Sequence, residues 1–90
     1  MEQLWAVVLG GSGAPGRLTE DHETVFVVAA DEKTAKSTAK KKWSGLGRAH
    51  VDALMSLSSV DGYRIELRPA DDAQADSFVS YNDDPHDEAE

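Results

Sequence analysis

Two uninterrupted apolar runs limit what this sequence can fold into more than any other feature. One covers residues 4–9 and ends at a Gly-Gly pair, and the other covers residues 24–30 and is rich in β-branched residues. Each has the length of a strand, and neither approaches the roughly 20 apolar residues that a membrane helix needs. Neither run alternates with polar residues, as a strand with one wet face does, so we expect both strands to be covered on both sides.

The size and composition of the chain allow one small domain. A chain of 90 residues with 40% hydrophobic residues can form a compact core, and we expect residues 1–68 to form a single domain. Cysteine is absent, which excludes disulfides, thiolate zinc sites and cysteine nucleophiles. The N-terminal residues lack the basic start and apolar stretch of a signal peptide, so the sequence favours a cytoplasmic protein with no membrane partner.

The net charge of −8 is confined to one end of the chain. Residues 1–68 hold nine acids and nine bases, whereas residues 69–90 hold eight acids and no base. The polar, acidic composition of residues 69–90 predicts a largely flexible tail, in which residues 78–81 are a candidate docking strand.

One helix is expected in the middle of the chain. Asp31 is a good N-cap, and no Gly or Pro interrupts the sequence from there to Trp43. Ala35, Ala39 and Trp43 fall on one stripe at a spacing of four residues. Gly45 is expected to end the helix in the left-handed conformation.

The residues after this helix are expected to form two more strands. Residues 51–57 alternate as a half-buried strand does, although a short helix also fits them. Asp61-Gly62 is a strong signal for a tight hairpin, and residues 63–67 alternate cleanly. The sequence therefore predicts an α+β fold of order ββαββ, with a mostly antiparallel four-stranded sheet and one helix on one face.

A glycine-rich segment follows the first apolar run. Residues 11–16 match the pattern GxGxxG, but residues 17–23 leave no room for the helix and parallel crossover of a dinucleotide site. A phosphate loop is excluded as well, because the required Lys and Ser or Thr are missing. What remains is a long loop between antiparallel strands that either faces a ligand or is an ordinary surface loop.

Two histidines stand near carboxylates. His22 follows Glu20 just before the second apolar run, and His50 lies two residues from Asp52, on one face of an extended chain. Such groups can bind a divalent metal or act as a general base, although a purely structural role is favoured. No catalytic residue is identified, no residue is assigned as a metal ligand and no cofactor is expected. The candidate ligand-binding residues are Gly11, Ser12, Gly13, Arg17, Glu20, His22, His50 and Asp52.

Nucleic-acid binding through residues 40–42 and Trp43 is not favoured. Lysines in a last helical turn complement the helix dipole, and an acidic tail would compete with phosphates for them.

Several of these pieces resemble, in order and spacing, the small bacterial family known as domain of unknown function 1543. The resemblance covers residues 4–67, and this chain departs from the family's Glu-Leu-His-Asp pattern at Asp21 and Glu23. Longer members resemble tandem copies, and the family implies a fold unit but no reaction. The matching pieces are Leu9-Gly10-Gly11, Glu20-x-His22, Phe26-Val27-Val28, Trp43, His50-x-Asp52 and Val60-Asp61-Gly62-Tyr63.

The packing predicts a partner. One helix covers one face of a sheet, so the other face presents Trp5, Val7 and Leu9 with Val25 and Val27, or the neighbours of these residues. A large exposed apolar patch marks an interface, so we expect a homodimer through the sheet and a role as a non-enzymatic interaction module, which includes contact with another protein. The alternative is a small-ligand or metal-binding site, catalytic in one version, formed by the glycine-rich loop with His22 and His50.

Overall fold

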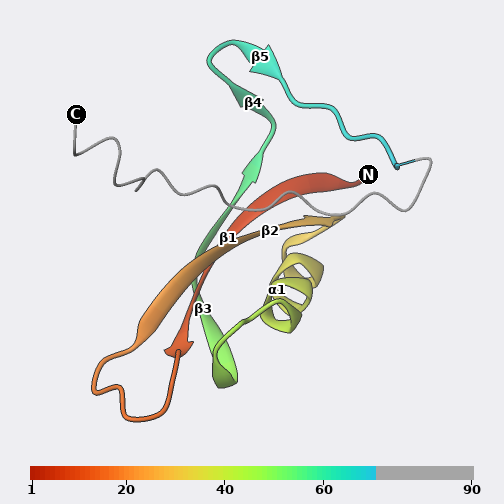
Figure 1. Cartoon of the computed structure of the whole chain (residues 1–90). Coiled ribbons are helices and arrows are strands. Elements are labelled where there is room, and N and C mark those ends of the chain that lie inside the picture. Colours follow the sequence, from red (N-terminus) through yellow and green to blue (C-terminus); the bar gives the residue numbers. More distant parts are fainter. Residues whose placement is uncertain (71–90) are drawn as a thin grey trace, which may run out of the picture.

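The structure, a computed structural model, describes residues 1–70 of the chain (Figure 1). β1 is the middle strand of an antiparallel three-stranded sheet of order β2-β1-β3, and β4 and β5 form a separate two-stranded hairpin. Within residues 1–70, no helix is both long and apolar enough to cross a bilayer. The candidate docking strand at residues 78–81 lies outside the described residues. The elements are β1 (Gln3–Ser12), β2 (Asp21–Ala29), α1 (Glu32–Lys41), β3 (Leu46–Leu57), β4 (Ser59–Val60) and β5 (Tyr63–Arg64).

The α+β class, the single helix and the antiparallel pairing are confirmed, but the prediction of a four-stranded sheet is wrong. The segment expected as the fourth strand pairs only over Tyr63–Arg64, and its partner is β4 rather than the main sheet. The main chain of Ile65 still donates a hydrogen bond to the carbonyl of Ser58, at 2.9 Å. Beyond that point no further strand is assigned in residues 65–70, because so short a hairpin buries too little apolar surface to hold a longer ladder.

The core lies between α1 and one face of the sheet (Figure 1). Alternate residues of β1 face the helix, and α1 contributes only small side chains, which lets its backbone lie close to the sheet. The indole nitrogen of Trp5 donates to the carbonyl oxygen of Ala29 at 3.0 Å, so this buried side chain leaves no polar atom unpaired. The core residues are Trp5, Val7, Leu9, Val27, Ala29, Ala35, Ala39 and Ala49.

The helix begins where the sequence predicts. The main-chain N–H of Thr34 donates to the Asp31 carboxylate at 2.7 Å, and this hydrogen bond holds the pKa of Asp31 below its ordinary value. The prediction for the other end is wrong: the cap is Lys42, and Gly45 is not among the residues with positive φ. Gly45 is needed for space, because a Cβ there would collide with the ring of Trp43.

Both connections between consecutive antiparallel strands agree with the sequence. Residues 13–20 contain no helix and join two antiparallel strands, as expected, although β1 and β2 are longer than the apolar runs and the loop is shorter. Asp61 and Gly62 have φ values of 54° and 83°, and Val60 pairs with Tyr63 across them. Two consecutive positive φ values are typical of the tight turn that an Asp-Gly pair favours.

Candidate functional site

The face of the sheet turned away from α1 is the candidate functional surface, and we call it the open face. Pairing across β1 arranges its side chains in rows. Three large members stay half exposed, with exposed fractions of 55% for Phe26, 49% for Val28 and 57% for Met55. The first three rows are Val28, Leu4 and Leu57, then Phe26, Ala6 and Met55, then Thr24, Val8 and Ala53.

The fourth row of the open face is polar. Gly10 of β1 lies between His22 of β2 and His50 of β3, so two histidines that are far apart in sequence flank one strand. With Asp52 and Glu20 they form what we call the histidine cluster. The side chains of all four remain partly exposed, by 54% for His22, 51% for His50, 52% for Glu20 and 35% for Asp52.

The two imidazoles of the cluster share the same carboxylates. The Nε2 atoms of His22 and His50 lie 2.9 Å and 3.0 Å from the two oxygens of Asp52. Both also approach one oxygen of Glu20, at 3.9 Å and 3.3 Å. The four side chains therefore form one connected polar group on the open face.

A β-bulge turns Asp52 toward the histidines. The register shifts between Val8, which pairs with Ala53, and Leu9, which pairs with Val51, so Asp52 has no partner on β1. A bulge lets two adjacent side chains share one side of a strand. Val51 can therefore pack against the core while Asp52 reaches His50 on the open face.

Gly10 leaves the space over which the cluster closes. A Cβ at this position would lie 2.9 Å from both Asp52 Oδ2 and His50 Nε2, and 3.1 Å from a carbon of the His22 ring. These distances are shorter than ordinary van der Waals contact, so the side chains converge above a position that only glycine leaves open.

The glycine-rich loop is not part of the cluster. Gly11 faces the other side of the sheet, where a Cβ would meet the Trp43 ring at 3.1 Å. Ser12 bonds within its own loop, and Arg17 pairs with Asp21 at 2.9 Å. Gly13 is enclosed by that same aspartate, since a Cβ on it would collide with the Asp21 carboxylate.

The candidate set therefore divides in two. Glu20, His22, His50 and Asp52 come together, whereas Gly11, Ser12, Gly13 and Arg17 do not join them.

The remaining acid near His22 has a structural role. Glu23 accepts hydrogen bonds from the main-chain N–H and the hydroxyl of Ser44, at 2.9 Å and 2.7 Å. These bonds tie the turn before β3 to β2 on the helix side of the sheet. Within residues 1–70, no group of three or more His, Asp or Glu side chains could hold a metal ion.

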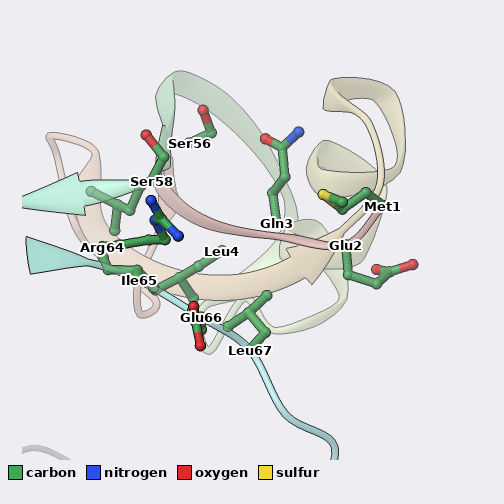
Figure 2. A pocket seen from close by; sticks show the side chains of 11 residues that line it. Met1, Glu2, Gln3, Leu4, Ser56, Ser58, Arg64, Ile65, Glu66 and Leu67 are labelled. Carbon is green, nitrogen blue, oxygen red and sulfur yellow. The ribbon is translucent and has the colours of Figure 1, made fainter.

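A pocket of about 760 Å³ lies at the end of the sheet opposite the cluster (Figure 2). The start of β1, the end of β3 and the segment after β4 line it, and Leu4 and Leu57 belong to both the pocket and the open face. It contains none of the candidate ligand-binding residues. The pocket therefore extends the apolar rows and is separate from the histidine cluster.

The sequence analysis missed Gly10 and the apolar members of the open face as site residues. The sequence did contain a signal for Gly10, because the first apolar run ends at the pair Gly10-Gly11. The members of the open face follow from register: the sequence left open whether odd or even positions of residues 4–9 face the helix, and the structure places Trp5, Val7 and Leu9 there.

The comparisons agree with this reading of the fold. The chain is similar to the crystal structure of a protein Il1583 from Idiomarina loihiensis, with a TM-score of 0.66 and 32% sequence identity. The match covers 78% of this chain and 50% of that one, so this chain spans about half of that relative's length. No curated protein matches the chain. The family pattern of DUF1543, a domain of unknown function, matches residues 17–67, and the chain belongs to this family.

Proposed function

We propose that this chain is a small cytoplasmic interaction module that forms a homodimer through the open face of its sheet. The observation that carries the proposal is the set of three rows in which Thr24 is the one polar residue, and in which Phe26, Val28 and Met55 each keep about half of their surface exposed. Contiguous apolar surface of this kind is typical of an interface, because its burial against a partner is favourable.

The β4–β5 hairpin supports the same proposal. It stands away from the sheet at the far end of β3 (Figure 1), and its side chains Val60 and Tyr63 are exposed. An isolated two-stranded hairpin is only marginally stable in water. Packing against a second protomer would give this hairpin the apolar contacts that its own protomer does not provide.

A second copy of this chain is the occupant that the observations favour. The solved relative is a chain of about twice the matched length, so there is room in that molecule for a second unit of this size. The present chain would obtain such a unit from another protomer. Residues 1–68 carry nine acids and nine bases, so charge repulsion between two bodies does not oppose their association.

The test is the molar mass of the full-length protein in solution, measured by light scattering after size-exclusion chromatography. We expect twice the protomer mass of 9.7 kDa for the wild type, and the protomer mass for Phe26→Asp. Phe26 lies outside the core, so this substitution places a charge in the interface without opening a cavity in the protomer.

Leu18→Asp is the matched control, because Leu18 is 99% exposed and lies in the loop between β1 and β2, outside the strand rows of the open face. It should leave the dimer intact, and circular dichroism should show the same fold for both variants. A wild type that remains at the protomer mass at high micromolar concentration contradicts the proposal, as does equal dissociation by both variants.

The histidine cluster favours a second candidate function, the binding of a small ligand. Two histidines from different strands approach the same two carboxylates, which concentrates polar groups at one end of an otherwise apolar face. The Arg17–Asp21 pair lies outside this group, so this version of the site does not include the glycine-rich loop.

A further inference from the structure

One arginine in the pocket at the end of the sheet has no acidic partner. Arg64 lines this pocket, and within residues 1–70 its guanidinium takes part in no ion pair. Glu2 and Glu66 line the same pocket, but Figure 2 shows their carboxylates pointing away from the guanidinium, which lies on the side of Ser58. The positive charge of Arg64 is therefore free to pair with an anion from outside the described part of the chain.

Main-chain contacts hold the walls of this pocket in place. Leu4 of β1 pairs with Leu57 of β3, and the main-chain N–H of Ile65 donates to the carbonyl oxygen of Ser58 at 2.9 Å. The first contact joins the start of β1 to the end of β3, and the second joins the end of β3 to the segment after β5. All three segments line the pocket, so its shape follows from the fold of the protomer.

The lining of the pocket indicates what kind of ligand it would take. Its volume of about 760 Å³ lies within the range of about 300–1,000 Å³ that is typical of small-molecule sites. Such sites combine apolar surface with a few polar groups that orient the ligand. A guanidinium binds a carboxylate through two parallel hydrogen bonds. The apolar lining residues include Leu4, Leu57, Ile65 and Leu67, and the polar residues beside Arg64 include Ser56 and Ser58.

We propose that this pocket binds a small monocarboxylate with an apolar chain. Arg64 pairs with the carboxylate, and the chain of the ligand lies against the leucine and isoleucine side chains. A ligand without a negative charge would leave the arginine unpaired, and a wholly polar ligand would leave the apolar lining in contact with water. This site is separate from the histidine cluster, and the proposal goes beyond the dimer and does not depend on it.

The competing explanation is that the pocket is a water-filled gap between β1 and the hairpin, and that Arg64 is an ordinary solvated side chain. In that case an apolar carboxylate would bind no more tightly than an uncharged molecule of the same length. The two explanations therefore differ in whether both the charge and the apolar chain of a ligand contribute to its affinity.

The experiment is a titration of the ¹⁵N-labelled full-length chain with sodium octanoate, followed by NMR of the main-chain amides. We expect saturation at one octanoate per protomer, with the largest shifts at Ser58 and Ile65. 1-Octanol, which has the same chain without the charge, should bind about tenfold or more weakly. Butanoate should also bind at least about tenfold more weakly, because each of the four missing CH₂ groups contributes about fourfold when it is buried.

Arg64→Gln should weaken octanoate binding by about tenfold or more and leave the binding of 1-octanol unchanged. Arg48→Gln is the matched control, because it removes the same charge from β3 at a residue that does not line the pocket, and it should bind octanoate as the wild type does. Phe26→Asp should also bind octanoate normally, so the outcome is independent of the dimer. Circular dichroism checks that each variant is folded.

The proposal is overturned if the wild type shows no saturable octanoate binding, or if octanoate and 1-octanol bind equally well. These two outcomes need no variant, so they test the proposal even where a substitution disturbs the hairpin. Equal octanoate affinity of Arg64→Gln and the wild type would overturn it as well. Loss of binding in Phe26→Asp, or shifts centred on the rows of the open face, would place the ligand on that face and contradict the pocket.

Discussion

At the scale of single residues, two adjacent glycines of β1 face opposite sides of the sheet and have different roles. Gly10 leaves room for flexible side-chain ends on the open face. Gly11 leaves room for the Trp43 ring and for the main-chain carbonyl of Arg48, which lies 3.2 Å from where a Cβ would stand. The same residue type therefore makes room for flexible side-chain ends at one position and for a packed ring and main chain at the next.

We expect Gly10→Ala to change the free energy of unfolding by no more than about 1 kcal/mol. The added Cβ would push apart the ends of the His50 and Asp52 side chains, which are free to move into solvent. Urea denaturation measures this free energy for the variant and for the wild type.

The matched variant is Gly11→Ala, in which the added Cβ meets the Trp43 ring and the main chain of Arg48. Its Cβ meets a ring packed against the core and main-chain atoms that cannot rotate away, so this variant should lose stability. A loss of stability in Gly10→Ala as large as that in Gly11→Ala would contradict this difference between the two glycines.

At the scale of elements, α1 depends on its first turn because it buries so little. Its two buried residues are Ala35 and Ala39, and each contributes only a methyl group to the core. Burial of a methyl group is a small contribution, so local interactions carry a large share of the stability of this helix. The N-cap at Asp31 is the most direct of them.

We expect Asp31→Asn to reduce stability at neutral pH, and the difference from the wild type to disappear in acid. The hydrogen bond from Thr34 lowers the pKa of Asp31 below 3.8, so the folded state favours the carboxylate. The contribution of this charge is therefore present above pH 3.8 and is lost as the pH falls through the lower pKa of the folded state. Asparagine keeps the capping oxygen and removes the titration.

Urea denaturation of both proteins from neutral pH down into the acid range measures this difference. A gap in stability that stays constant over that range would contradict the role of the Asp31 charge. Glu32→Gln, which removes a neighbouring charge in the same turn, controls for a general effect of lost acidity on the helix dipole.

At the scale of the whole molecule, the described part of the chain has one covered face and one uncovered face. The core is small, and its largest fully buried side chains are Leu9 and Val7. Small domains are marginally stable on their own, and burial of the open face in a dimer would add to the apolar surface removed from water.

The proposed dimer therefore predicts a melting temperature that depends on protein concentration. Unfolding coupled to dissociation becomes less favourable by about 1.4 kcal/mol of dimer for each tenfold rise in concentration, which corresponds to several degrees in a domain of this size. Calorimetric scans of the wild type at three concentrations measure the shift. Phe26→Asp should show none, and a wild type without any shift counts against a dimer that is linked to folding.

Much of the local structure could be predicted from the sequence. The two apolar runs lie in β1 and β2, Asp31 caps α1, and Asp61-Gly62 makes the tight turn. Each of these depends on residues within a few positions of one another, so the neighbouring sequence contains the information.

The errors concern interactions between distant segments. The segment at residues 63–67 alternates as a strand does, yet it does not join the sheet, because the turn at Asp61-Gly62 returns it to β4, beyond the end of β3. Gly45 has the residue type that often ends a helix. A glycine is required there for a different reason, because a side chain at this position would collide with the Trp43 ring.

For this protein, the sequence by itself determined the kind and order of the elements, because strand, cap and turn chemistry act over short distances. Only the tertiary structure decided which face of the sheet α1 covers and which candidate residues meet. The convergence of His22, His50 and Asp52 above Gly10 requires two antiparallel registers and one bulge. Register is a property of paired strands, and a shift of one residue would turn each of these side chains to the opposite face.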